Sequence, residues 1–527
     1  MDVTASIDSI GFGRFQWLLL AYTGLAWLAD ACETMLLSFL GLAVKCDWGL
    51  TSSQAAALTS VVFAGMMAGV YTLGALADQL GRRRGFLTSA LLLGVAGLAS
   101  AFSPNYSVLL GLRCVVGFAL GGTPIAVTLF AEFLPSRGRG GWLLALQAWW
   151  TLGTVVMACI AWRTVSTPGL GWRWMLGLGS APLFLLLALY PALPESPHWL
   201  ASRGEEAAAR AVLLRVARTN GRAGAGWAPL PTRDAGEAGA GVVIGSWPAT
   251  PDATPPPTPA KAARAGWGLG AALARVAASL RALYSPEFRR TTLLLDGIWF
   301  TNAITYYGLV LLSTELQTAH KEEQCTPDGQ PNLVGRDFLN IVITSAAEAP
   351  GLLAIAFLVD GRGRKWSLRA GLLLTGLSIL LLLAAGPGGG AQLFMLFLSR
   401  AGIMGAYSVL YIYTPEIYPT KLRSFGLALC NAMSRVGGFA APYATVSLVE
   451  SGRQTAALCL LGGMCLLACA AAFFLEHETR GRDLQAVRLS GPEAEDEALD
   501  GTPVGASPAM SAELVHTPRP PSGAQAS

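Results

Sequence analysis

Four ionisable residues lie deep inside long apolar segments of this sequence. Asp30 and Glu33 are near the middle of the first segment, three residues apart and therefore on one helical face. Arg113 lies in a later segment, and Glu348 precedes an Ala-Pro-Gly that should kink its helix. An ionisable group at the centre of a bilayer costs ~2.5 to 3.5 kcal/mol on insertion scales, so its presence indicates function. Because a carboxylate that loses a guanidinium partner binds protons more tightly, these four residues predict proton coupling, with a static packing ion pair as the alternative.

The high hydrophobic content and the low charge of the chain indicate that these segments lie in a membrane. Hydrophobic residues make up 53% of the 527 residues and charged residues 13%, whereas soluble globular chains carry ~25% charged residues. A spanning helix needs ~20 predominantly apolar residues. Windows of that kind run from about residue 16 to 44, 54 to 76, 86 to 102, 106 to 130, 142 to 162 and 172 to 193, and then from 291 to 312, 338 to 359, 368 to 385, 392 to 413, 425 to 449 and 455 to 474. The sequence therefore predicts an all-α membrane protein with twelve transmembrane helices.

The basic residues and one long polar stretch divide the chain. Most Lys and Arg residues between windows fall on one side, which the positive-inside rule places in the cytoplasm together with both termini. The middle of residues 194–289 is rich in Pro, Ala and Thr and is expected to be disordered, after a short helix that Ser202 and Glu205 should begin as a capping box. We expect a cytoplasmic N-terminus at 1–15, six-helix bundles at 16–193 and 290–475, a cytoplasmic linker at 194–289 and a disordered cytoplasmic tail at 476–527.

Short polar motifs recur in the same order in both halves of the sequence. The stretch "DQLGRR" after the second window matches "DGRGRK" after the eighth, and "EFLPSRGRG" after the fourth matches "EIYPTKLRS" after the tenth. Finally, "PESPHWL" and "HETRGRDL" follow the last window of each half. Three marks in one order, each offset by roughly 280 residues, indicate a duplicated six-helix unit.

Two parallel six-helix units joined by a cytoplasmic linker resemble the major facilitator superfamily. The stretch "GALADQLGRRR" (74–84) is similar to its loop motif between spans two and three, and "RCVVGFALGG" (113–122) to its fourth-span motif. Stretches such as "WFTNAITYYGLVLLSTEL" and "YTPEIYPTKLRSFG" resemble the branch of synaptic-vesicle-glycoprotein-related proteins and of organic cation/carnitine and niacin carriers. The resemblance implies two pseudo-symmetric bundles and places Arg113 where proton-coupled relatives pair an arginine with a first-span acid.

The repeated loop motifs predict a cytoplasmic gate. Halves that meet in one state and part in another need polar contacts that can break. Aspartates at helix ends can accept hydrogen bonds from the exposed amides of a facing helix, basic residues can pair with glutamates, and glycines permit close approach. The alternative is that the basic residues only anchor solvated helix ends. The predicted gate residues are Gly74, Asp78, Gly81, Arg82, Arg83, Glu132, Arg137, Asp360, Gly363, Arg364, Lys365, Glu416 and Lys421.

Aromatic and polar residues inside the windows could form the walls of a substrate site. Flat rings can stack on a planar or quaternary cation, and ordinary core packing is the alternative for each of them. The predicted substrate contacts are Asn302, Tyr306, Tyr307, Trp150, Tyr411, Asn431 and Arg435. Asn302 and Tyr306, one helical turn apart, are favoured. Arg400 parallels Arg113 by repeat position and could contact substrate or bond backbone carbonyls.

The cysteines, the histidines and the lack of a nucleotide-binding motif limit which kinds of site the sequence can form. Cys46 and Cys325 both fall in predicted noncytoplasmic loops, where a disulfide can form but would restrict rocking, so their pairing stays open. The P-loop pattern for ATP hydrolysis is absent. The four histidines lie outside the windows, which argues against a histidine-rich metal site. We expect no enzyme activity, no cofactor and no metal. The net charge of +4 gives no indication of a nucleic-acid partner.

These features together predict a secondary active transporter of a small organic ion that works by alternating access and is coupled to protons, as in symport. The buried acids suit an organic cation, whereas the arginines Arg113, Arg400 and Arg435 suit a carboxylate such as nicotinate, so the sequence leaves the sign of the substrate open. We expect a monomer in the lipid bilayer of the plasma membrane or an endomembrane vesicle. The alternatives are a passive facilitator and a non-transporting receptor or vesicle protein that retained the fold.

Overall fold

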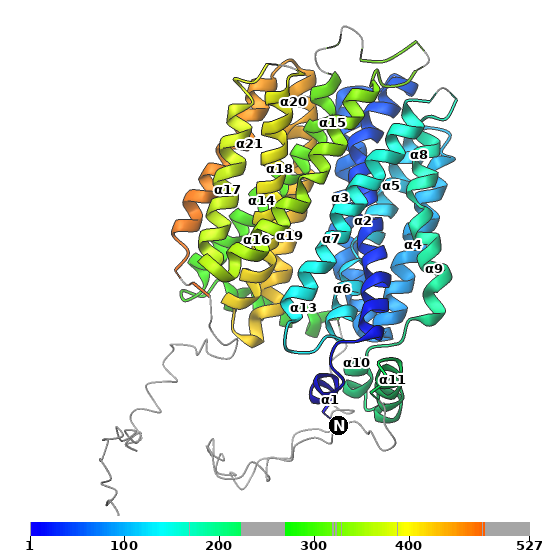
Figure 1. The fold of residues 1–527 in the computed structure, drawn as a ribbon, viewed down its shortest axis with the longest axis vertical. Coiled ribbons are helices and arrows are strands. Elements are labelled where there is room, and N and C mark those ends of the chain that lie inside the picture. The colour runs from blue at the N-terminus through cyan, green and yellow to red at the C-terminus, as the bar shows by residue number, and fades with distance from the viewer. Residues whose placement is uncertain are drawn as a thin grey trace, which may run out of the picture.

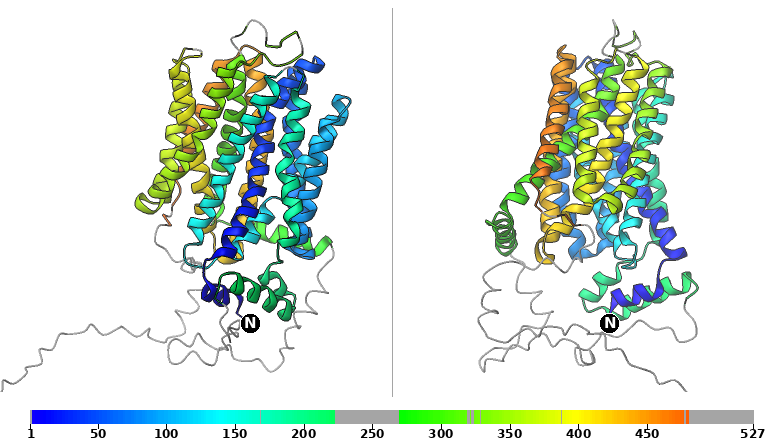
Figure 2. Two further views of the ribbon diagram at one scale, coloured as in Figure 1. Left: turned by 45° about the vertical axis from the view of Figure 1, so that its right-hand side comes forward. Right: turned by 60° about the vertical axis from the view of Figure 1, so that its left-hand side comes forward.

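The chain folds into two groups of long helices that stand side by side (Figure 1). This computed structural model describes residues 2–167, 169–222, 269–318, 321, 324–327, 329–386, 388–476 and 478–479. Apart from one isolated β-bridge between Cys325 and Pro331, the regular structure in these residues is helical. Figure 2 shows from two further sides that the long helices run roughly along one common axis.

The first half contains six spans, two of which are broken. Its helices are α2 (Arg14–Trp48), α3 (Ser52–Leu80), α4 (Arg82–Ala101), α5 with α6 (Tyr106–Leu120 and Pro124–Ala131), α7 (Arg139–Val165) and α8 with α9 (Gly171–Gly179 and Ala181–Leu189). Pro124 begins α6 and Pro182 lies in the first turn of α9. Proline is tolerated at these positions because the first helical N–H groups have no intrahelical acceptor. The two prolines therefore mark where each span is interrupted.

The second half repeats this pattern. Its helices are α14 (Arg289–Thr318), α15 with α16 (Gly335–Ala346 and Glu348–Arg362), α17 (Arg364–Leu381), α18 (Gly390–Ile417), α19 (Thr420–Ala444) and α21 (Gln454–Phe473), with the short α20 (Val446–Glu450) after α19. The α15–α16 break falls at Ala347, next to the predicted Glu-Ala-Pro-Gly kink. The two parts of a broken span pack as one membrane crossing.

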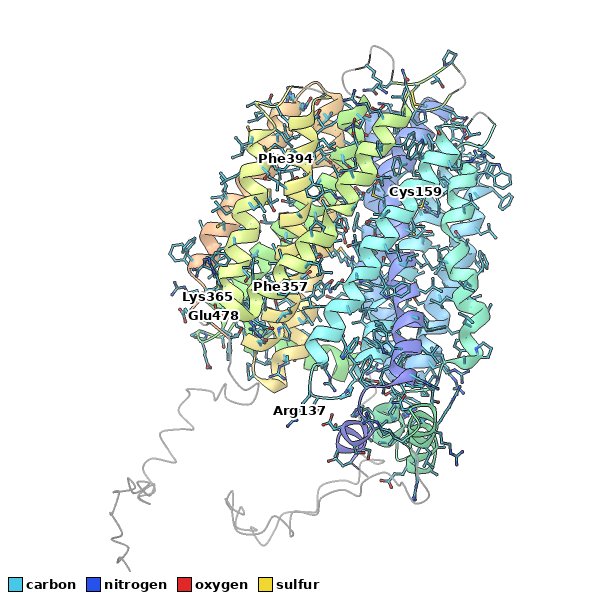
Figure 3. The ribbon with its side chains drawn as sticks, in the orientation of Figure 1. Arg137, Cys159, Phe357, Lys365, Phe394 and Glu478 are labelled. Carbon is cyan, nitrogen blue, oxygen red and sulfur yellow. A yellow bond between two sulfur atoms is a disulfide. The ribbon has the colours of Figure 1, made fainter. Side chains whose placement is uncertain are left out.

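Nine spans in the described part of the chain have the length and hydropathy of a membrane-crossing helix. The helices α14, α17 and α19 stand among them in Figure 1 and bring the spans to twelve, nine plus three. Their sequences are less apolar because they carry charged residues, such as Asp296 in α14, Arg369 in α17 and Arg435 in α19. Large apolar side chains such as Phe357 and Phe394 are exposed on the outer surface (Figure 3), as expected of lipid-facing positions.

Shorter helices gather at one end of the bundles, which we call the linker end. The helices α1 (Val3–Ile10), α10 (Pro197–Ser202) and α11 (Glu206–Thr219) pack together beneath the first half, and α13 (Leu269–Leu283) packs on α19 (Figure 1). Burial lowers the pKa of His198 on α10, so this side chain is neutral near pH 7. The linker stretch 223–268 and the tail from residue 480, both predicted to be disordered, lie outside the described residues.

Three local predictions were wrong. Ser202 ends α10 instead of beginning the next helix, and its hydroxyl donates a hydrogen bond to the Trp199 carbonyl at 2.7 Å. Glu205 precedes α11 without a side-chain cap. Helix α13 occupies part of the stretch expected to be disordered, because contact with α19 stabilises it. Cys46, expected in a loop, lies in the last turn of α2.

The two halves are joined covalently at the opposite end, which we call the disulfide end. Cys46 of α2 forms a disulfide with Cys325, which lies between α14 and α15, and their Cα atoms are 5.5 Å apart. The neighbouring Lys45 pairs with Glu450 of α20 at 2.6 Å. The structure thus decides a pairing that the sequence left open, and two adjacent residues of α2 both bind the second half.

Packing between the halves continues from the disulfide end toward the middle of the bundles. Phe338 of α15 stacks on Phe39 of α2 and on Trp162 of α7. The Ser60 hydroxyl on α3 donates to the Phe439 carbonyl of α19 at 2.9 Å. At the linker end, the ion pairs between motif residues join residues of one half. The structure is therefore closed at the disulfide end.

The disulfide predicts a covalent link between the halves that survives cleavage of the linker. We expect a protein with a specific protease site inserted between residues 223 and 268 to run, after cleavage, as one band on non-reducing denaturing gels and as two bands after reduction. Cys46→Ser should give two bands under both conditions, because Cys325 then has no partner. Two bands from the cleaved parent protein without reductant would show that the link does not form.

Candidate functional site

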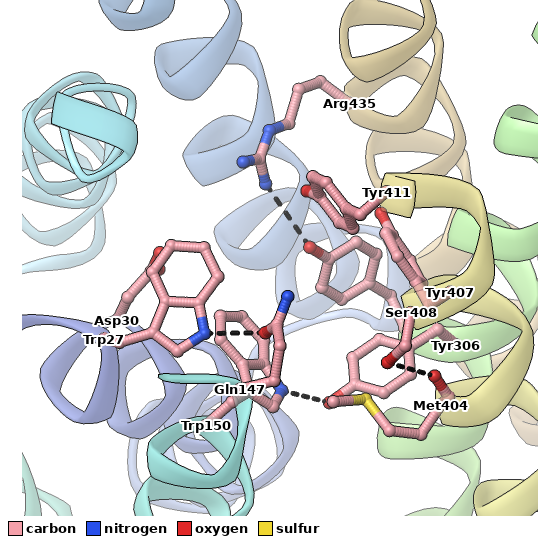
Figure 4. Close-up of a pocket in the computed structure, with 11 residues that line it drawn as sticks. Trp27, Asp30, Gln147, Trp150, Tyr306, Met404, Tyr407, Ser408, Tyr411 and Arg435 are labelled. Atoms are coloured by element: carbon pink, nitrogen blue, oxygen red, sulfur yellow. Dashed lines mark hydrogen bonds between the residues drawn. The ribbon is translucent and has the colours of Figure 1, made fainter. Parts of the chain in front are cut away.

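A narrow cavity lies between the two halves (Figure 4). Its wall comes from α2 and α7 of the first half and from α14, α18 and α19 of the second. The lining residues are Trp27, Asp30, Gln147, Trp150, Tyr306, Tyr307, Met404, Tyr407, Ser408, Tyr411 and Arg435. Six of these eleven side chains are aromatic. The volume of about 40 Å³ admits water, whereas sites for organic ligands usually measure ~300 to 1,000 Å³. In this state the cavity is therefore too small for an organic ligand.

One acid and one base face this cavity from opposite halves. Asp30 of α2 is buried, and its Oδ1 atom has no hydrogen-bond partner among the described residues. Arg435 of α19 donates from Nη1 to the Tyr307 hydroxyl at 3.3 Å, while its Nε has no partner within the same residues. Buried polar atoms are normally paired. The two unpaired atoms can therefore be satisfied by water or by a charged ligand.

A buried ion pair stabilises the core of the first half. Arg113 of α5 donates from Nη1 to Glu33 Oε2 at 3.0 Å, and both side chains are almost fully buried. The Nε and Nη2 atoms of Arg113 donate to the Ser100 hydroxyl at 3.2 and 2.8 Å. Glu33 and Asp30, predicted to share one helical face, therefore differ in environment: Glu33 binds the arginine, whereas Asp30 lines the cavity.

A second buried ion pair lies in the other half and reaches the cavity. Arg400 of α18 donates from Nη2 to Glu348 Oε1 at 2.6 Å. The same oxygen accepts a hydrogen bond from the Tyr306 hydroxyl at 2.9 Å, and Tyr306 in turn accepts one from Trp150 Nε1 at 2.6 Å. Arg400 thus pairs with an acid instead of bonding carbonyls. The Trp150 contact crosses from the first half to the second.

The structure brings most of the predicted substrate residues together. Trp150, Tyr306, Tyr307, Tyr411 and Arg435 all line the cavity. Asn431 does not line it but donates to the Tyr411 hydroxyl at 3.4 Å, and Asn302 is buried away from the lining.

Five lining residues are not among the predicted site residues: Trp27, Gln147, Met404, Tyr407 and Ser408. Gln147 could have been found from the sequence, because it is a polar residue inside an apolar span. In the structure its side-chain carbonyl oxygen accepts a hydrogen bond from Trp27 Nε1 at 2.9 Å. Met404 and Ser408 are ordinary residues of membrane helices, so only the packing of α18 identifies them.

The repeated loop motifs form two similar polar networks at the linker end. Arg82 contacts Asp78 and lies 3.5 Å from Glu132 in the first half. In the second half, Arg364 contacts Asp360 at 3.4 Å and binds Glu416 through two parallel hydrogen bonds of 3.1 and 3.2 Å. Both networks therefore join motif residues within one half, so the predicted contact between the halves at this end is not formed by these ion pairs in this state.

Two glutamates that the sequence reasoning did not assign complete these networks. Glu195 accepts a hydrogen bond from the Arg83 amide at 3.0 Å, and Glu478 accepts them from the Arg364 and Lys365 amides at 2.8 and 3.0 Å. Each glutamate thus caps the helix after the loop. The expected acceptors, Asp78 and Asp360, bind arginine side chains instead. The sequence did contain a signal for these glutamates, because Glu195 and Glu478 are the middle residues of "PES" and "HET" in the third repeated motif.

Glycine geometry explains part of the motif. Gly81 and Gly363 have φ values of 104° and 94°, and a Cβ atom at either would collide with Glu195 or Glu478. Gly74 is different, because a Cβ there would meet no atom within 4 Å, so close approach is not required at Gly74 in this state.

One predicted gate residue with a described side chain, Arg137, lies outside the networks described above. Arg137 is exposed at the linker end, whereas Lys365 lies beside Glu478 (Figure 3). The side chain of Lys421 lies outside the described residues.

Two family models match the chain. The one described as "Sugar (and other) transporter" matches residues 22–226, and the one described as "Major Facilitator Superfamily" matches residues 298–515. The chain is 39% identical over 500 residues to organic cation/carnitine transporter 7 of Arabidopsis thaliana, covering 92% of this chain and 95% of that protein. It is also 39% identical over 495 residues to the synaptic vesicle 2-related protein of Xenopus laevis, covering 92% and 82%.

The fold is similar to a solved transporter structure. The xylose transporter XylE from E. coli, in an inward open conformation, gives a TM-score of 0.65 and covers 89% of this chain and 98% of that chain. The sequence identity is 16%, so this similarity concerns the fold alone.

The buried Glu33–Arg113 pair predicts that removing one partner destabilises the protein strongly and that removing the second charge as well restores most of the stability. We expect Arg113→Met to lower the melting temperature of the purified protein strongly, because removing one partner of a buried ion pair costs ~3 to 5 kcal/mol. The double variant Glu33→Gln/Arg113→Met should recover most of the loss, since no buried charge then remains. Glu476→Gln, which removes the exposed partner of Arg290, should change the melting temperature little. Equal losses in the single and double variants would contradict this expectation.

Proposed function

Because this chain belongs to the major facilitator superfamily, whose members are transporters and not enzymes, we propose that it is a secondary active carrier that moves a small organic ion by alternating access, coupled to protons. The observation that carries the proposal is the pair of incompletely satisfied charged side chains, Asp30 with its free Oδ1 atom and Arg435 with its free Nε atom among the described residues, which face one cavity from opposite halves. A site shared by two bundles must change when the bundles tilt.

The closure at one end supports alternating access. Contacts between the halves are concentrated at the disulfide end, whereas the motif networks at the linker end stay within each half. A tilt that opens the disulfide end would bring the two networks toward each other. Arg82 and Arg364, with their acidic partners, are then the groups available to form a gate at the linker end, with Gly81 and Gly363 shaping the loops.

Buried carboxylates support proton coupling. Asp30 lines the cavity without a partner for Oδ1, and Glu33 and Glu348 each share a buried ion pair. A carboxylate in a poorly solvated site binds protons more tightly, and a nearby cation reverses this effect. Movement of water, substrate or Arg113 relative to these acids therefore changes their protonation. This links the proton gradient to the conformational cycle.

The lining supports a flat or compact organic ion as the substrate. Tyr306 and Tyr307 pack edge to face at 5.3 Å, and Tyr407 and Tyr411 stack at 5.7 Å. Such rings hold planar groups and cations. Asp30 would attract the cationic part of a substrate and Arg435 a carboxylate. The names of the relatives, organic cation/carnitine transporter among them, are consistent with this class.

The charge distribution supports an orientation. Basic residues of the repeated motifs lie at the linker end, and positively charged loops favour the cytoplasmic side. We therefore place the linker end, both termini and the segment 194–289 in the cytoplasm. The disulfide end then faces the outside or the lumen, where oxidising conditions preserve disulfides. The protein acts as a monomer in the plasma membrane or in an endomembrane vesicle.

Uptake by reconstituted protein tests the proposal. Proteoliposomes should accumulate radiolabelled choline, L-carnitine or nicotinate above the equilibrium level when a pH gradient is imposed, and only equilibrate without one. Asp30→Asn and Glu33→Gln should each reduce gradient-driven accumulation by roughly tenfold or more, because a coupling carboxylate has been removed. Glu476→Gln, at an exposed position, serves as the matched control.

Each other outcome has a definite meaning. Equilibration that ignores the pH gradient would identify a passive facilitator. Absence of uptake for a broad panel of cationic amines and aromatic carboxylates would favour a receptor or vesicle protein that retained the fold. Full gradient-driven accumulation in both acid variants would remove Asp30 and Glu33 from the coupling role.

A further inference from the structure

A chain of hydrogen bonds crosses the interface between the halves and ends on a buried acid. Trp150 of α7 donates to the Tyr306 hydroxyl at 2.6 Å, Tyr306 donates to Glu348 Oε1 at 2.9 Å, and Arg400 donates to the same oxygen at 2.6 Å. Trp150 belongs to the first half and the other three residues to the second. Figure 4 shows the Trp150–Tyr306 contact at the edge of the cavity.

The chemistry of tryptophan fixes the direction of this chain. The indole N–H can only donate, whereas a phenol both donates one proton and accepts. While Trp150 occupies the acceptor side of Tyr306, the phenol proton is directed to Glu348. Hydrogen bonds in series also polarise one another, so the Trp150 bond makes Tyr306 a stronger donor. Both effects favour the ionised form of Glu348.

The ion pair beneath this chain is incompletely satisfied. Glu348 Oε2 and the Nε and Nη1 atoms of Arg400 have no hydrogen-bond partner within the described part of the chain. A fully buried charge is stable only with well-placed partners. The single bond from Tyr306 therefore contributes strongly to keeping Glu348 ionised, and the bare Oε2 atom is the position where a proton can be added without breaking either bond to Oε1.

The groups around Glu348 limit what else could control it. Arg400 of α18 and Tyr306 of α14 are the charged and titratable side chains that contact it, and α7 faces it with Trp150 and Thr151. Arg400 moves with Glu348, because both belong to the second half. The positions of Trp150 and Thr151 thus depend on how the two halves are tilted, and Trp150 is the one of the two that is joined to Glu348 through Tyr306.

We propose that Trp150 is a positioning residue through which the first half lowers the proton affinity of Glu348, with the Tyr306 hydroxyl as the intermediate. The contact exists while the halves meet at the disulfide end. When they part there, Tyr306 loses its donor, its hydroxyl is free to turn toward the cavity, and Glu348 takes up a proton more readily. The inference rests on the proposed function for its role in transport, whereas the hydrogen-bond chain itself can be tested without transport.

Infrared difference spectroscopy of the purified protein tests this directly. The carboxyl band that Glu348→Gln removes reports the pH at which Glu348 is half protonated. In Trp150→Phe this pH should rise by roughly 0.5 to 1 unit, the effect of losing about one hydrogen bond. Tyr306→Phe should shift it in the same direction at least as far, and the double variant no further than Tyr306→Phe. Trp149→Phe, whose ring packs against Gly24 outside the cavity, is the matched control.

The outcomes separate this inference from the proposed function. An unchanged midpoint in Trp150→Phe, additive shifts in the double variant, or a Glu348 band that does not titrate between about pH 4 and 10 would overturn the role of Trp150. If the midpoint shifts as expected but the wild-type protein shows no gradient-driven uptake, the inference stands and the proposed function fails. If uptake is proton-coupled, its pH profile should move upward in Trp150→Phe and stay in place in Trp149→Phe.

Discussion

A charge buried among apolar helices must keep a partner, and the arrangement of both bundles depends on this constraint. Glu33 and Arg113 join α2 to α5, and Glu348 and Arg400 join α16 to α18. Separating either pair would leave a charge in a medium that cannot solvate it. The pairs therefore fix neighbouring helices within each half. Asp30 and Arg435, which belong to neither pair, face the cavity where the halves meet.

The two buried pairs show how far the duplication extends. Arg113 and Arg400 occupy equivalent spans, the fourth of each half, but their acids come from the first span in one half and from the second span in the other. The requirement of a buried arginine is only that some carboxylate reaches it. As a result the two pairs differ in their connection to the cavity: the second pair is linked to it through Tyr306, whereas the first is bonded to Ser100 inside its own half.

The contacts at the two ends of the bundles differ in kind. At the disulfide end, a covalent bond and the Lys45–Glu450 pair join the halves. Cys325 lies in the connection between α14 and α15 and not in a helix, so the bond ties the end of α2 to a connecting segment of the second half. At the linker end, Glu195 and Glu478 cap helices within their own half. The motif networks therefore hold together helices of the same half.

The sequence by itself determined the membrane class, the twelve spans, the duplication and the arginines and acids of the two loop motifs, because hydropathy and repeated polar motifs are local properties of the chain. It also identified Asp30, Glu33, Arg113 and Glu348 as unusual. The tertiary structure alone decided which acid binds which arginine, that Glu195 and Glu478 cap the loops, that Asn302 lies away from the cavity and that Cys46 binds Cys325. These outcomes depend on the rotation of each helix about its axis and on contacts between residues far apart in the chain, which packing sets and spacing does not.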